Sequence, residues 1–236
     1  MILTCQQVVK CYRDKRVLDG IDLDVPEGQF FGLVGMNGSG KSTLIKSTLD
    51  LIGIDSGVIR IHGKPHRSVE ARRQVAYLPD RFSPPVHLRG KDFIRYMLDM
   101  HHSNKTQAEI DEILDGLELH PSELRESVNK LSKGMTQKLG LASCLLSGKT
   151  FLILDEPMSG LDPRARVLFK QQLAKLKQQG VTVFFSSHVL ADVEEIADNM
   201  AVLHNSSIYF SGAPAEFKDK YQSDSVEMAY MRCIEQ

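Results

Sequence analysis

Short apolar runs alternate with segments of helical periodicity along the 236 residues of this chain. Three runs, at residues 30–34, 151–154 and 181–185, are apolar except for Gly32 and Thr182, which is typical of strands buried on both faces of a parallel sheet. Each run is followed by apolar residues at helical spacing; the first helix, with Ile52 on its apolar face, is expected to end at Gly53. Strands that alternate with helices predict an α/β fold with a mostly parallel sheet.

Alternating apolar and polar residues mark further strands. Residues 1–9, 17–25 and 57–63 read as short strands with one exposed face, and we expect an antiparallel sheet beside the parallel one. Tyr12 is placed in the connection between the first two. Additional strands are predicted at residues 75–79, 200–203 and 207–210, the last two as a hairpin.

Residues 81–130 have helical periodicity without an intervening strand. Thr106 and Glu109 form a capping box, so a helix is expected to begin there. This segment carries no cluster of catalytic side chains, and we interpret it as an inserted helical subdomain. The predicted division is therefore a core with its antiparallel sheet at 1–80 and 131–212, a helical subdomain at 81–130, and a C-terminal extension of short helices at 213–236.

A phosphate-binding loop follows the first apolar run. Residues 35–42 read Gly-Met-Asn-Gly-Ser-Gly-Lys-Ser and match the pattern G-x-x-x-x-G-K-[ST]. The glycines let backbone N–H groups point inward, and the helix that follows adds positive potential. Lys41 can reach the β- and γ-phosphates of a nucleotide, and the Ser42 hydroxyl can ligate Mg²⁺. The residues expected to bind the nucleotide here are Gly35, Asn37, Gly38, Ser39, Gly40, Lys41, Ser42 and Thr43.

Two carboxylates, Asp155 and Glu156, follow the apolar run at residues 151–154. Such groups at the end of a buried strand are costly unless they serve a cation or accept a proton. Asp155 would bind Mg²⁺, directly or through water, and Glu156 would orient or deprotonate an attacking water. His188 follows the run at 181–185, where a lone histidine is more often structural.

Bulk properties narrow the class of protein. A net charge of −1 gives no basic field that would favour nucleic acid as the main partner. No apolar run approaches the roughly 20 residues that span a bilayer, and the first residues lack the pattern of a signal peptide, so we expect a cytosolic protein. The four cysteines lack metal-site spacing and are expected to be reduced thiols.

Residues 131–135, Leu-Ser-Lys-Gly-Met, open a predicted helix and have no function in a bare phosphate-loop enzyme. With this segment the chain resembles the ATP-binding subunits of ABC transporters over nearly its full length. The family signature Leu-Ser-Gly-Gly-Gln is matched at Leu131, Ser132 and Gly134. The other family motifs stand in family order: Tyr12 as the aromatic that stacks on adenine, the phosphate loop, Asp155-Glu156, residues 159–162 as the D-loop with Asp162, and His188 as the switch histidine.

The resemblance implies an ATP hydrolase that works as a head-to-tail pair of ATP-binding subunits, with a homodimer expected. ATP and Mg²⁺ on one copy would be capped by the other copy's signature, where Ser132 and the Gly134 N–H would hold the γ-phosphate. Glu156 and His188 would be the catalytic residues, and Asp162 would lie at the nucleotide. The helical subdomain would pass the motion to separate integral membrane permease subunits, which places the chain on the cytoplasmic face of the membrane.

Several positions depart from the family pattern or mark a branch of it. Leu78-Pro79-Asp80 and the Lys-Gly-Met of the signature resemble the ABC-2 type branch, whose members are mostly exporters. Lys133 adds a charge that suits a triphosphate, whereas Met135 cannot donate a hydrogen bond. Asp80 stands where the family usually has glutamine, and we expect it to contact Mg²⁺ through water. The alternative is a solvated acid that pairs with Arg81.

Other classes of protein fit the sequence less well. A soluble ABC protein that acts on DNA or ribosomes usually carries two nucleotide domains or long coiled-coil insertions, whereas this sequence has one set of motifs and a short insertion. A small GTPase needs the motif N-K-x-D, and residues 129–132 lack the aspartate. A regulatory ATPase that binds ATP without hydrolysis is disfavoured by Glu156 and His188. The transported substrate cannot be read from this chain, because its contacts lie in the membrane partner.

Overall fold

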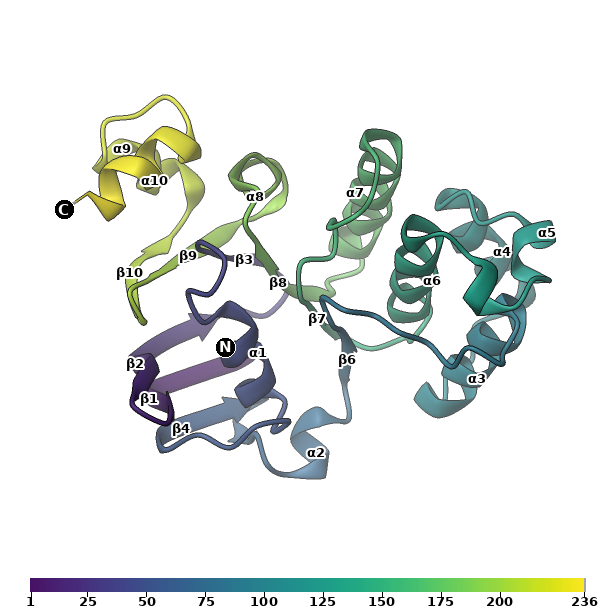
Figure 1. The fold of residues 1–236 in the computed structure, drawn as a ribbon, viewed down its shortest axis with the longest axis horizontal. Helices are drawn as coiled ribbons and strands as arrows, with labels where there is room; N and C mark the ends of the chain where they lie inside the picture. The colour runs from purple at the N-terminus through teal and green to yellow at the C-terminus, as the bar shows by residue number, and fades with distance from the viewer. Residues whose placement is uncertain (236) are drawn as a thin grey trace.

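A six-stranded sheet forms the centre of the computed structural model, which describes residues 1–235 (Figure 1). The strands are β3 (Phe30–Val34), β6 (Val75–Leu78), β7 (Phe151–Leu154), β8 (Thr182–Ser187), β9 (Asn199–His204) and β10 (Ser207–Gly212), in the spatial order β10-β9-β3-β8-β7-β6. All neighbours pair in parallel except β9 and β10, which form the predicted hairpin. The three predicted apolar runs correspond to β3, β7 and β8. These strands lie side by side and are buried throughout, as their composition predicts.

The predicted antiparallel sheet is also present, with strand order β2-β1-β4-β5. It is formed by β1 (Leu3–Tyr12), β2 (Lys15–Val25), β4 (Ser56–Ile61) and the short β5 (Lys64–Pro65). One expectation was wrong in detail: Tyr12 is the last residue of β1, where it pairs with Lys15, and not part of the connection. A backbone hydrogen bond of 2.8 Å from Asp19 N–H to the Ser206 carbonyl connects the two sheets.

Helix α1 (Lys41–Thr48) lies in a core shared by the antiparallel sheet and one face of the central sheet. The prediction that this helix runs to Gly53 was wrong. The Leu51 N–H bonds to the Lys46 carbonyl and the Asp50 N–H to the Ser47 carbonyl, which is the hydrogen-bond pattern of a Schellman termination. Asp50 takes a left-handed φ of 59°, which aspartate tolerates better than most residues, so the chain turns away before Ile52.

The remaining helices belong mainly to the other core, which covers the opposite face of the central sheet. They include α6 (Lys133–Leu145), α7 (Pro163–Gln178) and α8 (Leu190–Ile196), together with α3 (Gly90–His101), α4 (Gln107–Gly116), α5 (Pro121–Leu124) and the 3-10 turn η1 (Val128–Lys130). The capping box of Thr106 and Glu109 is formed at the start of α4, as predicted. Figure 1 shows α3, α4 and α5 gathered beside α6, at the opposite end of the molecule from the antiparallel sheet. Their division from the core as a subdomain stays a prediction.

The short helix α2 (Val69–Arg72) precedes β6, and the chain closes with α9 (Pro214–Lys220) and α10 (Val226–Ile234). The backbone N–H of Val226 donates to Glu194, which attaches α10 to α8. Cys144 is buried, and all four cysteines are free. Within residues 1–235, no helix has the length and apolar character that crossing a membrane requires.

Candidate active site

The predicted phosphate loop, carboxylates and histidine meet at the carboxyl ends of the central strands. Strands β3, β7 and β8 are parallel neighbours, so the segments that follow them leave from the same edge. A cavity of about 250 Å³ opens there. It is lined by Val17, Asn37, Gly38, Gly40, Lys41, Ser42, Thr43, Asp80 and Glu156. The structure thus brings the phosphate loop together with Asp80 and Glu156.

The phosphate loop holds a buried cation at the start of α1. The Lys41 ammonium donates to the Gly35 carbonyl at 2.7 Å and to the Met36 carbonyl at 3.3 Å, and the residue is only 6% exposed. Gly40, the residue before the helix, has a φ of 113°, and a Cβ there would lie 2.8 Å from the Val17 carbonyl oxygen. Glycine is required at that position both for its backbone conformation and for space.

Asp155 is a buried carboxylate at the end of β7, with 1% of its surface exposed. Its Oδ1 accepts a hydrogen bond of 2.6 Å from the Ser186 hydroxyl. Burial raises the pKa of Asp155; hydrogen bonds from Ser186 and Ser42 oppose this rise, and the charges of Asp80 and Glu156 add to it. The Ser42 hydroxyl and the carboxylates of Asp80 and Asp155 are hard oxygen donors of the kind that Mg²⁺ prefers, so these residues fit that ion.

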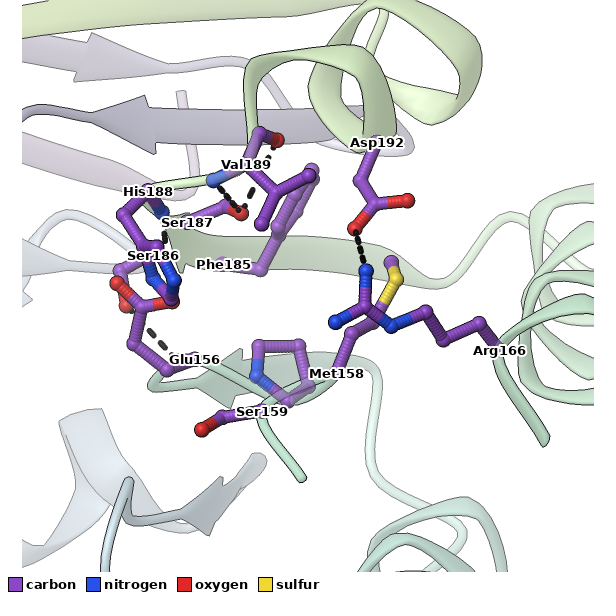
Figure 2. A pocket seen from close by; sticks show the side chains of 11 residues that line it. Glu156, Met158, Ser159, Arg166, Phe185, Ser186, Ser187, His188, Val189 and Asp192 are labelled. Atoms are coloured by element: carbon purple, nitrogen blue, oxygen red, sulfur yellow. Dashed lines mark hydrogen bonds and ion pairs between the residues drawn. The ribbon is translucent and has the colours of Figure 1, made fainter. Parts of the chain in front are cut away.

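Glu156 connects the other parts of the site. Its Oε1 lies 3.4 Å from the Lys41 ammonium, and its Oε2 lies 2.7 Å from His188 Nδ1 and accepts from the His188 N–H at 3.3 Å. Oε1 is buried and has no hydrogen-bond partner among residues 1–235. The φ of Glu156 is 51°, in the left-handed region that few glutamates occupy. Figure 2 shows Glu156 and His188 side by side above the end of β7.

Ser186 is a site residue that sequence reasoning missed. Its hydroxyl donates to Asp155 Oδ1 and accepts the Glu156 N–H at 2.9 Å, so it fixes the side chain of one carboxylate and the backbone of the next. The apolar run that predicted this strand ends at Phe185, whereas β8 runs to Ser187. The feature of the sequence that could have identified Ser186 is its position: it directly continues a buried strand, and the two carboxylates follow another buried strand.

Other predicted site residues lie outside the cavity that holds Lys41. Tyr12 is 47% exposed, with the Lys10 ammonium 5.4 Å from its ring centre. Ser132 is the N-cap of α6, and its hydroxyl accepts the Met135 N–H at 3.2 Å. Asp162 is the N-cap of α7, and its Oδ1 accepts the Ala165 N–H at 2.9 Å.

The signature and the D-loop lie against each other in one chain. A Cβ on Gly134 would meet the Gly160 carbonyl at 3.5 Å, and a Cβ on Gly160 would lie 3.2 Å from the Lys133 side chain. Neither segment lines the cavity of the phosphate loop. For Asp80, no ion pair to Arg81 is formed within residues 1–235, and the residue faces the cavity instead.

This fold and this site define a phosphate-loop nucleoside triphosphatase. The family model described as ABC transporter matches residues 18–159. The chain is 34% identical over 227 residues to the uncharacterized ABC transporter ATP-binding protein YhaQ of Bacillus subtilis, covering 95% of this chain and 76% of that protein. It is 35% identical over 215 residues to the Nod factor export ATP-binding protein I of Burkholderia thailandensis, covering 89% of this chain and 70% of that protein.

A solved structure described as an ATP binding subunit of an ABC transporter superposes with a TM-score of 0.89 at 26% identity, covering 99% of each chain. The chain therefore belongs to the ABC transporter family. It is an ATP-binding protein of that family and an ATP hydrolase.

Proposed function

We propose that two copies of this chain close head to tail over ATP and Mg²⁺ and thereby drive export through separate membrane permease subunits. The observation that carries the proposal is the separation of two parts of the site within one copy. Lys41 and Glu156 line the cavity, whereas Ser132 and Gly134 do not. A second copy would supply them from the N-terminus of its α6, where backbone N–H groups favour an anion.

Each site would bind ATP mainly through the phosphate loop. Lys41 and the backbone N–H groups of the loop would hold the phosphates, and Tyr12 would stack on the adenine from the end of β1. Gly35, Asn37, Gly38, Ser39, Gly40 and Thr43 would complete the loop. The exposure of Tyr12 leaves its ring free for such a contact.

Mg²⁺ would be held by the Ser42 hydroxyl and Asp155, with Asp80 contributing through water. When bound, it would neutralise charge that develops on the transferred phosphoryl group. The buried carboxylate of Asp155, whose ionised form is disfavoured by burial, supports a cation at this position.

Glu156 would act on the attacking water. Its Oε1 pairs with Lys41 and its Oε2 is held by His188. Once Lys41 pairs with phosphate instead, Oε1 is the oxygen free to accept the proton of water, while His188 keeps the carboxylate oriented. Asp162 would lie near the second copy, because it belongs to the D-loop that packs on the signature.

Export is supported by the similarity to a Nod factor export ATP-binding protein. The permease subunits would hold the chain at the cytoplasmic face of the membrane. The ATPase rate of purified protein tests the pairing. Because each site needs residues of two copies, the rate per chain should rise with protein concentration and should require Mg²⁺. A rate per chain that stays constant from the lowest to the highest concentration would show that one copy is complete.

A further inference from the structure

A small enclosed pocket of about 10 Å³ lies behind Glu156 and His188 (Figure 2). It is too small for a ligand, and its far wall is formed by Arg166 of α7 and Asp192 of α8. Neither residue has a part in the chemistry described above. Both nevertheless lie beside segments that do, since Arg166 follows the D-loop and Asp192 follows His188 by four residues.

Arg166 connects the D-loop to α8. Its Nε donates to the backbone carbonyl of Leu161, in the D-loop, at 3.3 Å. Its Nη1 lies 3.6 Å from Asp192 Oδ2. Figure 2 shows the guanidinium extending from α7 toward the carboxylate of Asp192. One planar side chain thus contacts a loop backbone on one side and a helix side chain on the other.

The burial of Asp192 makes this contact specific. Its side chain is 7% exposed, and its Oδ1 lies 2.7 Å from the ammonium of Lys170. Its Oδ2 accepts no hydrogen bond within residues 1–235, so the ion pair with Arg166 is what compensates that oxygen. Removing a partner of a buried charge is much more disruptive than removing one of a solvated pair.

The segment between His188 and Asp192 is short and begins with a hydrogen-bonded turn. The Val189 N–H donates to Ser187 Oγ at 3.0 Å, just before α8 begins at Leu190. His188 lies in this turn and contacts Glu156 through Nδ1. A displacement of the D-loop would therefore reach His188 through Arg166, Asp192 and this turn.

We propose that Arg166 and Asp192 are positioning residues for ATP hydrolysis. The pair fixes the D-loop relative to His188, so that closure of the second copy on the D-loop sets the orientation of Glu156. This inference rests on the proposed function, because only a second copy would load the D-loop. ATP binding depends on the phosphate loop and is independent of the pair.

Lys170 provides a matched control. It binds the same carboxylate and also Glu195, but among the described residues it forms no hydrogen bond or ion pair with the D-loop. Arg166→Met and Lys170→Met each remove one cation from Asp192 and keep an apolar stem of similar length. Only the first removes the connection to Leu161. Arg166→Lys keeps the charge and loses the planar fork.

The experiment compares these variants in the full chain by ATP affinity, kcat, Tm and amide hydrogen exchange without nucleotide. Arg166→Met should lower kcat by about tenfold to a hundredfold, as expected for a misplaced catalytic group, while the ATP Kd stays at the wild-type value. Exchange at residues 159–162 and 187–189 should become faster together. Lys170→Met should lower Tm by a similar amount but leave kcat close to wild type. The kcat of Arg166→Lys should lie between that of wild type and that of Arg166→Met.

The proposal is overturned if both methionine variants lose kcat in proportion to their loss of Tm, because the cluster is then only structural. It is also overturned if Arg166→Met leaves exchange in either segment unchanged. Failure of the proposed pairing would appear separately, as a wild-type rate per chain that is independent of concentration. In that case the exchange measurement still decides whether Arg166 connects the two segments.

Discussion

At the scale of single residues, Glu156 is where the interactions of the site converge. Its two oxygens contact Lys41 and His188, and its N–H is held by Ser186. Its left-handed φ of 51° costs on the order of 1 kcal/mol or more. That conformation is compensated by these contacts and directs the carboxylate toward the phosphate loop. The sequence motifs identified Lys41, Glu156 and His188 as candidates, but this backbone conformation and the contacts of Ser186 depend on the register of β7 and β8.

Asp155→Asn should stabilise the Mg²⁺-free protein at pH 7. Because burial raises the pKa of Asp155, the native state binds its proton more tightly than the unfolded state. The native state therefore loses stability as the pH rises from about 4, the pKa of an exposed aspartate. An asparagine cannot ionise and still accepts the Ser186 hydrogen bond. In EDTA, the variant's Tm should exceed that of wild type at pH 7, and the gap should shrink toward pH 4. A lower Tm for the variant at pH 7 would contradict this account.

Asp80 should affect the response to Mg²⁺ and leave the binding of ATP intact, since Lys41 and Ser42 remain. Asp80→Ala should raise the Mg²⁺ concentration needed for half-maximal hydrolysis. The Mg²⁺ concentration that Asp80→Asn needs should lie between those of wild type and Asp80→Ala, because the amide keeps an oxygen but loses the charge. The measurement is a Mg²⁺ titration of hydrolysis in the three proteins. Superimposable curves would leave Asp80 as a solvated acid.

At the scale of elements, the central strands were predictable and the ends of elements were not. Strands β3, β7 and β8 are buried on both faces, so their composition alone identifies them. Helix α1 ends at Thr48 because Asp50 adopts a left-handed conformation, which periodicity does not reveal. The end of β8 at Ser187 is set by pairing with its neighbours rather than by hydrophobicity. The start of α7 is set locally, because Asp162 supplies an N-cap acceptor and Pro163 is a first-turn proline.

Ser132 should have two separable effects, one on its helix and one on the pairing of subunits. It caps α6 as Thr106 caps α4, with hydroxyls that accept backbone N–H groups at 3.2 Å and 3.3 Å. Replacing either residue by alanine should lower the free energy of unfolding by about 1 kcal/mol, measured by urea denaturation. Only Ser132→Ala should weaken the ATP-dependent association of two chains, and ATP affinity of the single chain should be unchanged. Equal effects of both variants on association would assign Ser132 a capping role alone.

At the scale of the whole molecule, the phosphate loop and the signature lie apart within one copy of the chain. The phosphate loop lies at the edge of the central sheet, whereas the signature lies at the start of α6 and packs against the D-loop. Gln137, two residues after the signature, donates to the carbonyl of Pro157, two residues before the D-loop, at 3.1 Å, so a hydrogen bond also connects the segments that flank the two motifs. A second copy that docks its signature would therefore bring its D-loop with it. This is the arrangement in which hydrolysis at one site can be sensed by the other copy.

The association of the Glu156→Gln chain tests this account most directly. Glutamine keeps the shape of the side chain but cannot accept the proton of water, so ATP and Mg²⁺ should bind without being consumed. In sedimentation velocity, this variant should be a monomer with ADP and should have twice the monomer mass with saturating ATP and Mg²⁺. Adding Lys41→Ala should abolish the association, because ATP is no longer held. A Glu156→Gln chain that binds ATP by calorimetry and still sediments as a monomer would contradict the head-to-tail pair.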